Sequence, residues 1–66
     1  MKNTLKVQRA KANITQDDLA KILNVSRQTI YSIEKNVYVP STVIALKLAD
    51  YFDVKVEDLF SLEDSD

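Results

Sequence analysis

The stretch TQDDLAKILNVSRQTIYSIE, residues 15–34, decides the fold. Thr15 is a good N-cap, and two carboxylates follow it in the first turn, where the helix dipole favours negative charge. The first helix ends near Asn24, because Asn is second only to Gly in adopting the left-handed conformation. Ser26 is placed to cap a second helix at once. The stretch therefore predicts two short helices joined by a three-residue turn, over about residues 15–36.

Apolar residues outside this stretch also recur at spacings of three and four, which is the helical period. Further helices are expected over residues 4–12, over residues 42–52 after a Ser41 cap, and from residue 56 to 60 or 62. No segment alternates apolar and polar residues for long enough to predict a sheet. Short connections between five helices predict an all-α fold, a compact five-helix bundle.

The composition excludes several classes of protein. The chain has no Cys, His or Gly, which rules out disulfides, zinc fingers, thiol or imidazole catalysis and glycine-rich nucleotide loops. No apolar run approaches the ~20 residues of a membrane span, and nothing resembles a signal peptide. We expect a cytoplasmic protein that is not an enzyme, with no cofactor, metal, membrane contact or small-molecule ligand. So small a core supplies about 3–5 kcal/mol, and a homodimer is a simple way to stabilise it.

Charge is distributed unevenly along what we expect to be one domain, residues 1–66. Residues 1–35 carry seven Lys or Arg against three acidic residues, and residues 36–66 carry two against seven. The N-terminal part could therefore face a polyanion while the C-terminal part faces away. The alternative is that the charges are unevenly distributed by chance and that no partner is involved. The acidic tail, 61–66, is expected to fray over Glu63 to Asp66.

Two helices with so short a turn are the sequence form of a helix-turn-helix, whose second helix can enter the DNA major groove. An ordinary helical hairpin in a small bundle has the same spacing. The outer face of the second helix favours DNA. With Ile30 and Ile33 turned inward, Arg27 and Gln28 lie outside in the first turn, and these residue types pair with guanine and adenine edges. No carboxylate occurs on this helix before Glu34.

The whole pattern resembles the DNA-binding domain of the lambda Cro/cI repressor family, also called the xenobiotic-response-element-like family. The resemblance covers about residues 4 to 60. The combination of segments is specific to the family, although each segment alone is a weak signal. Within the family the chain is most similar to compact stand-alone repressors, such as the enterococcal cytolysin-operon repressor, which are homodimers of about this length. The segments that carry the resemblance are Leu5 to Arg9, Ile14 to Ala20, Val25 to Ile30, Ile33-Glu34, Pro40-Ser41, Leu48-Ala49 and Val56 to Phe60.

The resemblance implies a sequence-specific transcriptional regulator, a repressor, that binds double-stranded operator DNA of a bacterial nucleoid. It implies a homodimer on two-fold related half-sites. The residues that match base-reading positions are Ser26, Arg27, Gln28 and Ser32, although Ser26 could serve as an N-cap alone. The residues that match DNA-backbone contacts are Gln16, Thr29, Tyr31, Lys35, Asn36 and Tyr38, of which Thr29 and Tyr31 could instead touch base edges.

The family also implies an ion pair between Arg9 and Glu34, which accounts for a charge on the apolar side of the first helix. The alternative is that both side chains are exposed. Asn24 and Asn36 stand where the family often has Gly, and Lys55 stands where a Ser, Thr or Pro is usual, so the last helix is expected to be poorly capped. A dimer seam is expected among apolar residues outside the main stripes: Ile44, Tyr51, Phe60 and Leu62.

A protein-interaction module, such as an antitoxin with secondary DNA binding, is the alternative function. Its signature is a disordered, partly apolar tail, and only residues 61–66 are available for one here. Two adjacent carboxylate pairs, Asp17-Asp18 and Glu57-Asp58, do not predict metal sites. Adjacent residues on a helix point about 100° apart, so neither pair converges on one ion, and helix-dipole complementarity explains both.

Overall fold

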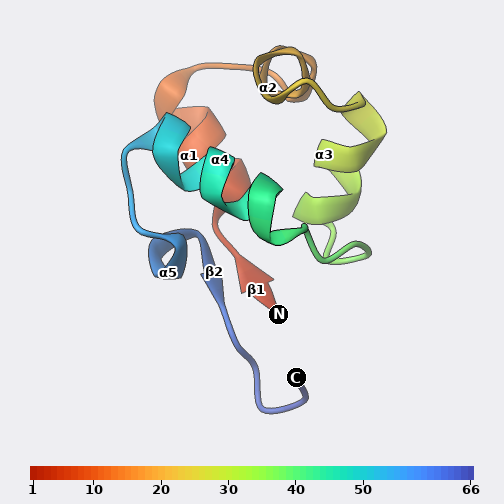
Figure 1. Ribbon diagram of the computed structural model, residues 1–66, viewed down its shortest axis with the longest axis vertical. Coiled ribbons are helices and arrows are strands. Elements are labelled where there is room, and N and C mark those ends of the chain that lie inside the picture. Colours follow the sequence, from red (N-terminus) through yellow and green to blue (C-terminus); the bar gives the residue numbers. More distant parts are fainter.

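The computed structural model describes all residues, 1–66, and contains five helices with a short strand near each end of the chain (Figure 1). The helical fold predicted from the sequence is confirmed. None of the helices is long and apolar enough to cross a membrane. The elements are β1 (Lys2–Asn3), α1 (Leu5–Ala12), α2 (Gln16–Leu23), α3 (Arg27–Glu34), α4 (Thr42–Phe52), α5 (Val56–Leu59) and β2 (Phe60–Ser61).

Side-chain caps set where three of the helices begin. The hydroxyl of Thr15 accepts the backbone N–H of Asp18 at 3.0 Å, at the start of α2. Ser26 and Ser41 do the same for the third residue of α3 and α4, at 3.1 and 3.2 Å. At α5 the side chain of Lys55 offers no acceptor, and only the carboxylate of Asp58 accepts the Lys55 N–H, at 3.1 Å. The helix thus lacks the side-chain acceptor at its N-cap, as the sequence predicts, but keeps the bond from the Lys55 N–H to Asp58.

Left-handed residues end the helices in a chain without Gly. Asn13, Asn24, Asn36 and Asp53 have φ of 57°, 58°, 60° and 54°. Asn and Asp tolerate this region because their short polar side chains bond locally. Asn24, at the end of α2, and Asn36, just after α3, thus take the left-handed conformation that the sequence predicts for them.

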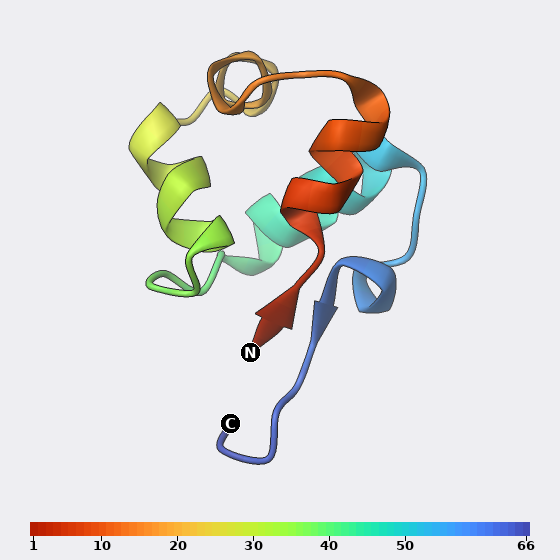
Figure 2. The ribbon, with the colours of Figure 1, turned by 180° about the vertical axis from the view of Figure 1, so that it is seen from behind.

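One apolar cluster forms the core, and every helix contributes to it. Leu5, Leu19, Leu48 and Leu59 are fully buried, one each from α1, α2, α4 and α5. Seen from behind, α2 and α3 lie on one side of the molecule and α5 with the strand pair on the other (Figure 2). The core therefore carries α2 and α3 as a packed pair, with one face of each exposed to solvent.

The strand pair was not predicted. Lys2 pairs with Ser61 and Asn3 with Phe60 in antiparallel register. Thr4 extends the contact, since its N–H donates to the carbonyl of Leu59 at 2.9 Å. The prediction that the last helix reaches residue 60 or 62 is wrong, because Phe60 is extended, with φ of −127° and ψ of 137°. A hydrogen-bonding partner almost sixty residues away overrides the local helical period there.

The fraying predicted for the tail is also wrong. The carboxylate of Asp66 accepts a hydrogen bond from the ammonium group of Met1 at 3.0 Å and one from the N–H of Glu63 at 2.7 Å. These bonds hold the pKa of Asp66 below its ordinary value, and the bond to Asp66 raises the pKa of the Met1 amino group. The strand pair brings the two oppositely charged ends together, so the tail folds back.

Acid should weaken the cap of α2. The carboxylate of Asp18 accepts the N–H of Thr15 at 3.0 Å, which lowers the pKa of Asp18 below its ordinary value. A carboxyl group whose pKa is lower in the folded state stabilises the fold above its unfolded pKa, and this contribution is lost as the pH falls through the folded pKa. We expect Asp18→Asn to melt below the native protein at neutral pH, with the two converging below about pH 4.

Thermal melts at a series of pH values measure this effect. Asp17→Asn is the matched control, because Asp17 stands in the same turn and makes no cap bond. If the difference in melting temperature between Asp18→Asn and the native protein stays constant down to acid pH, the Asp18 carboxylate does not stabilise the cap of α2.

Candidate nucleic-acid interface

The helix α3 has a buried face and an exposed face. Ile30 and Ile33 are 0% and 1% exposed. Ala20, 2% exposed on α2, and a bond from the Val25 N–H to its carbonyl at 2.9 Å hold the turn between the two helices tightly. The opposite face of α3 is solvent-exposed and carries Arg27, Gln28, Tyr31 and Lys35.

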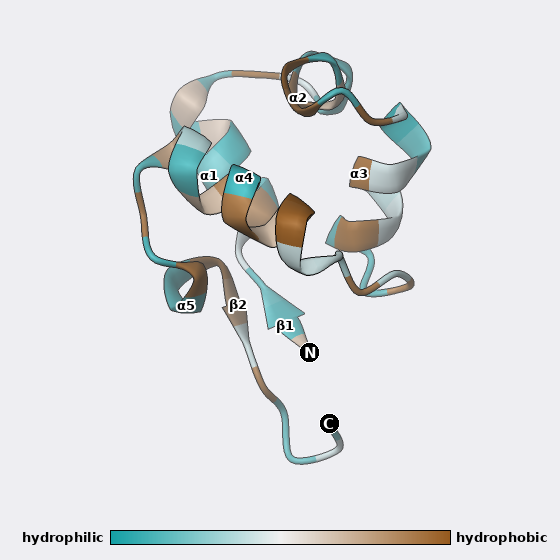
Figure 3. Ribbon diagram, viewed as in Figure 1, coloured by the Kyte–Doolittle hydropathy of each residue, from teal (hydrophilic) through white to brown (hydrophobic).

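The first turn of α3 is hydrophilic (Figure 3). Arg27 and Gln28 are exposed and have no role in the core. The amide of Gln28 donates to the hydroxyl of Ser32 at 3.3 Å, one turn further along. The hydroxyl of Ser26 caps the N–H of Thr29 and lies 2.9 Å from the Thr29 hydroxyl. Ser26 thus acts as the N-cap, and the outermost polar groups are those of Arg27 and Gln28.

An ion pair connects α1 to the end of α3. Arg9 Nε donates to Glu34 Oε2 at 2.7 Å and Arg9 Nη2 to Glu34 Oε1 at 3.1 Å. The side chains are 15% and 6% exposed. Arg9 Nη1 also donates to the carbonyl of Ile14 at 3.1 Å, and bonding to Glu34 raises the pKa of Arg9 further above its usual range. The pair ties α1, the loop before α2, and α3 together.

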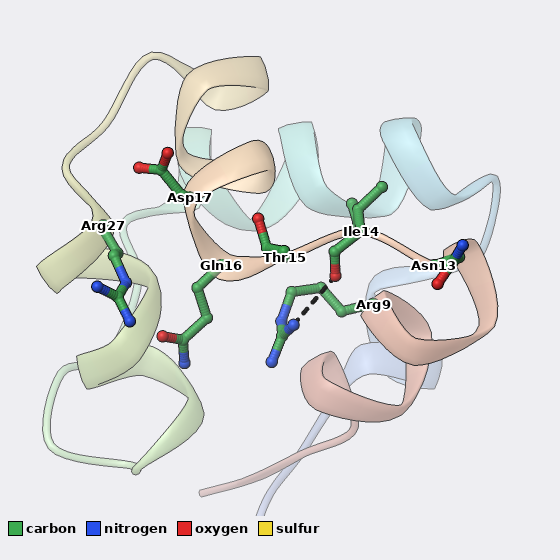
Figure 4. A pocket seen from close by; sticks show the side chains of 7 residues that line it. All are labelled: Arg9, Asn13, Ile14, Thr15, Gln16, Asp17 and Arg27. Atoms are coloured by element: carbon green, nitrogen blue, oxygen red, sulfur yellow. Dashed lines mark hydrogen bonds between the residues drawn. The ribbon is translucent and has the colours of Figure 1, made fainter.

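Gln16, predicted to touch a phosphate, joins this network. Its amide Nε2 donates to Glu34 Oε1 at 3.1 Å. It stands between Arg27 and Arg9 along an open hollow, and the polar ends of all three point to the same side (Figure 4). An amide nitrogen has two N–H groups, so one of them stays available for a ligand while the other holds Glu34.

The turn after α3 holds the remaining predicted contacts. The N–H groups of Val37 and Tyr38 both donate to the carbonyl of Ser32, at 2.9 and 3.2 Å. The ammonium of Lys35 lies 5.8 Å from the centre of the Tyr31 ring, a cation–π distance. Lys35, Asn36 and Tyr38 are exposed and gather at the end of α3 opposite to Arg27.

Comparison with known proteins identifies this arrangement of helices. Residues 5–59 match the sequence profile of the helix-turn-helix family. The chain belongs to the helix-turn-helix family.

Relatives of this helix-turn-helix (HTH) protein match it along its length. An uncharacterized HTH-type transcriptional regulator of Methanocaldococcus jannaschii is 58% identical over 66 residues, all of both chains. Another, of Bacillus subtilis, is 45% identical over 64 residues, 97% of each chain. One of Archaeoglobus fulgidus is 42% identical over 66 residues, all of this chain and 93% of the relative. The HTH protein is therefore a DNA-binding transcriptional regulator, as its sequence predicts.

One residue of the HTH protein was missed by the sequence analysis. Asn3 on β1 donates from its amide to the carbonyl of Ile33 at 2.9 Å and to Asn36 Oδ1 at 2.8 Å. Its partners are 30 and 33 residues away along the chain. No local pattern signals such contacts, because they depend on the strand pair that places β1 beside the end of α3.

Proposed function

We propose that this protein is a repressor that binds a two-fold operator as a homodimer and reads bases with α3. The observation that carries the proposal is the exposed first turn of α3, where Arg27 and Gln28 have no partner in the core. Arg pairs with the O6 and N7 atoms of guanine, and Gln with N6 and N7 of adenine. The one carboxylate on α3, Glu34, is neutralised by Arg9, so it does not repel a phosphate.

Candidate phosphate contacts lie at both ends of the reading helix. Arg27 is at one end, and Lys35, Asn36 and Tyr38 are at the other. Gln16 lies alongside α3, since it lines a hollow with Arg27 and its amide donates to Glu34. Eight residues of helix span about 12 Å, which is close to the width of the major groove. Contacts at the two ends of α3 therefore suit the two backbones that border one groove. On this proposal Ser32 contacts bases, and Thr29 and Tyr31 contact the backbone.

Binding alone accounts for the proposed activity. A regulator that occupies a promoter excludes other proteins from it and needs no reaction. The side chains that line the hollow beside α3 are Arg9, Asn13, Ile14, Thr15, Gln16, Asp17 and Arg27, a set that suits an anionic ligand and includes no nucleophile with an adjacent base. The protein is then a non-enzymatic regulator that works on operator DNA in the cytoplasm.

The dimer seam is proposed on an exposed apolar face. Of the seam residues expected from the sequence, Phe60 is 8% exposed and fills the core, and Ile44 packs against that core. Tyr51 and Leu62 stay exposed.

The first half of α4 and the loop before it carry further exposed apolar residues. Val39, Val43 and Leu46 are 68%, 61% and 57% exposed. Val39 and Leu46 line one apolar hollow. Such a face suits a symmetric contact in which the same patch meets itself.

Selection of bound sites from random duplex DNA tests the proposal, with the native protein and Leu46→Glu side by side. The native protein is expected to enrich two inverted half-sites about 34 Å apart, one turn of DNA. Leu46→Glu places a charge in the seam and is expected to enrich a single half-site and to sediment as a monomer.

The matched control is Val7→Glu, which changes an apolar residue on α1 that is 52% exposed and is not among the proposed seam residues. It should behave like the native protein. Enrichment of no sequence at all contradicts base reading and favours the protein-interaction module. A monomeric native protein that binds single half-sites contradicts the dimer.

A further inference from the structure

The side chain of Asn3 is held by three hydrogen bonds. Its Oδ1 accepts the N–H of Leu5 at 3.2 Å. Its Nδ2 donates to the carbonyl of Ile33 at 2.9 Å and to Asn36 Oδ1 at 2.8 Å. The bonds thus join β1 to the start of α1 and to the last turn of α3.

Two backbone groups determine which way the Asn3 amide faces. The N–H of Leu5 can only donate, so the Asn3 atom beside it is the oxygen. The carbonyl of Ile33 can only accept, so the atom beside that is the nitrogen. The atom of Asn36 that faces Asn3 Nδ2 must then be an acceptor, which is its own Oδ1.

This polarity decides what Asn36 presents to solvent. With Oδ1 turned toward Asn3, the nitrogen of the Asn36 amide and its two N–H groups point the other way. No hydrogen bond within the chain uses them. Phosphate oxygens only accept hydrogen bonds, so a side chain that meets a phosphate must present donors.

We propose that Asn3 is a positioning residue, which orients the Asn36 amide with its N–H groups toward a DNA phosphate. The inference deepens the proposed function and rests on it, because Asn36 must lie against the DNA backbone. The backbone is ordered by neighbouring structure on both sides. Asn3 is paired in register with Phe60 of β2, and Asn36 is fixed in the left-handed region at φ 60°.

A double-mutant cycle on operator affinity tests the proposal. Asn3→Ser keeps a side-chain oxygen for the N–H of Leu5 but loses the amide donors. Asn36→Gly removes the amide and, having no Cβ, keeps the positive φ without strain. Loss of one hydrogen bond is worth about 1 kcal/mol. Asn3→Ser is therefore expected to weaken binding about fivefold per half-site in the native background, and less than about twofold in the Asn36→Gly background.

Controls separate positioning from general stability. Thr4→Ala removes a hydrogen bond from the same end of the chain, to the carbonyl of Asp58 at 2.8 Å, without touching α3. It should lower the melting temperature and leave operator affinity unchanged. Thermal melts establish that each variant is folded. If Asn3→Ser is not, Asn3→Thr serves as a second variant, because it also keeps a side-chain oxygen and lacks the amide donors, and Thr suits a strand better.

The outcomes are distinct. An effect of Asn3→Ser that is equal in both backgrounds overturns the proposal, because Asn3 then acts on the fold and not through Asn36. Full affinity of Asn36→Gly overturns it as well, since Asn36 then makes no contact with DNA. A native protein without operator discrimination instead overturns the proposed function itself.

Discussion

Replacing Arg27 by alanine is expected to weaken operator binding by about 1–3 kcal/mol in each half-site, a factor of roughly 5 to 150, and to relax the preference at one base position. The reason is that a bidentate pair with a guanine edge is lost, while the groove still accepts α3. Stability should change by less than about 0.5 kcal/mol, because Arg27 is exposed and outside the core. Gln28→Ala is expected to act alike at a different base position.

Lys35→Ala is the matched control for the reading residues. Lys35 is exposed on the same helix side, beside the Tyr31 ring. Its loss should weaken binding to all sequences alike and reduce the slope of log affinity against log salt by about 0.9 for each half-site. Affinities for the operator, for single-base variants of it and for random DNA measure these effects. If Arg27→Ala and Gln28→Ala stay folded and keep full discrimination, α3 is not the reading helix.

Removing Glu34 is expected to have the largest effect on stability. In Glu34→Ala the Arg9 guanidinium, whose side chain is 15% exposed, loses both of its bonds to the carboxylate. Breaking a buried pair from one side costs about 3–5 kcal/mol. We expect the lower end, because Arg9 keeps the Ile14 carbonyl. For a domain of this size, ~3 kcal/mol lowers the melting temperature by about 12–24 °C.

Two further variants show that the cost comes from the unpaired charge. Glu57→Ala removes an exposed carboxylate that has no ion pair and should melt within a few degrees of the native protein. The double variant Arg9→Met with Glu34→Leu removes both charges and should recover most of the loss, because well-packed apolar residues often replace a buried pair without penalty. Thermal melts followed by circular dichroism measure all four proteins. A Glu34→Ala protein as stable as Glu57→Ala contradicts this role for the pair.

The local features of the fold could be predicted because their physical causes lie within a few residues. Thr15, Ser26 and Ser41 cap the N–H three positions on, and Asn24 and Asn36 take the left-handed region. These are short-range preferences of single side chains. The inward face of α3 follows in the same way, from the spacing of Ile30 and Ile33.

Contacts between residues far apart in the sequence could not be predicted from the local sequence pattern alone. The pairing of Arg9 with Glu34 was expected only because the chain resembles a family, since no spacing rule connects residues 25 positions apart. The sequence predicts Phe60 in a dimer seam because it is an apolar residue outside the main stripes. It fills the core instead, because β2 turns it inward. Gln16 was assigned to a phosphate, and its bond to Glu34 depends on how α2 meets α3.

The sequence by itself determined the five helices, the boundaries of the first four to within a residue or two, the buried stripe of α3 and the residue types on its outer face. Each of these depends on a side chain and its neighbours within about one helical turn. Only the tertiary structure decided the strand pair, the return of Asp66 to Met1 and the contact of Asn3 with Asn36. Those contacts join residues that are far apart along the chain, and whether they meet depends on positions set by the whole fold.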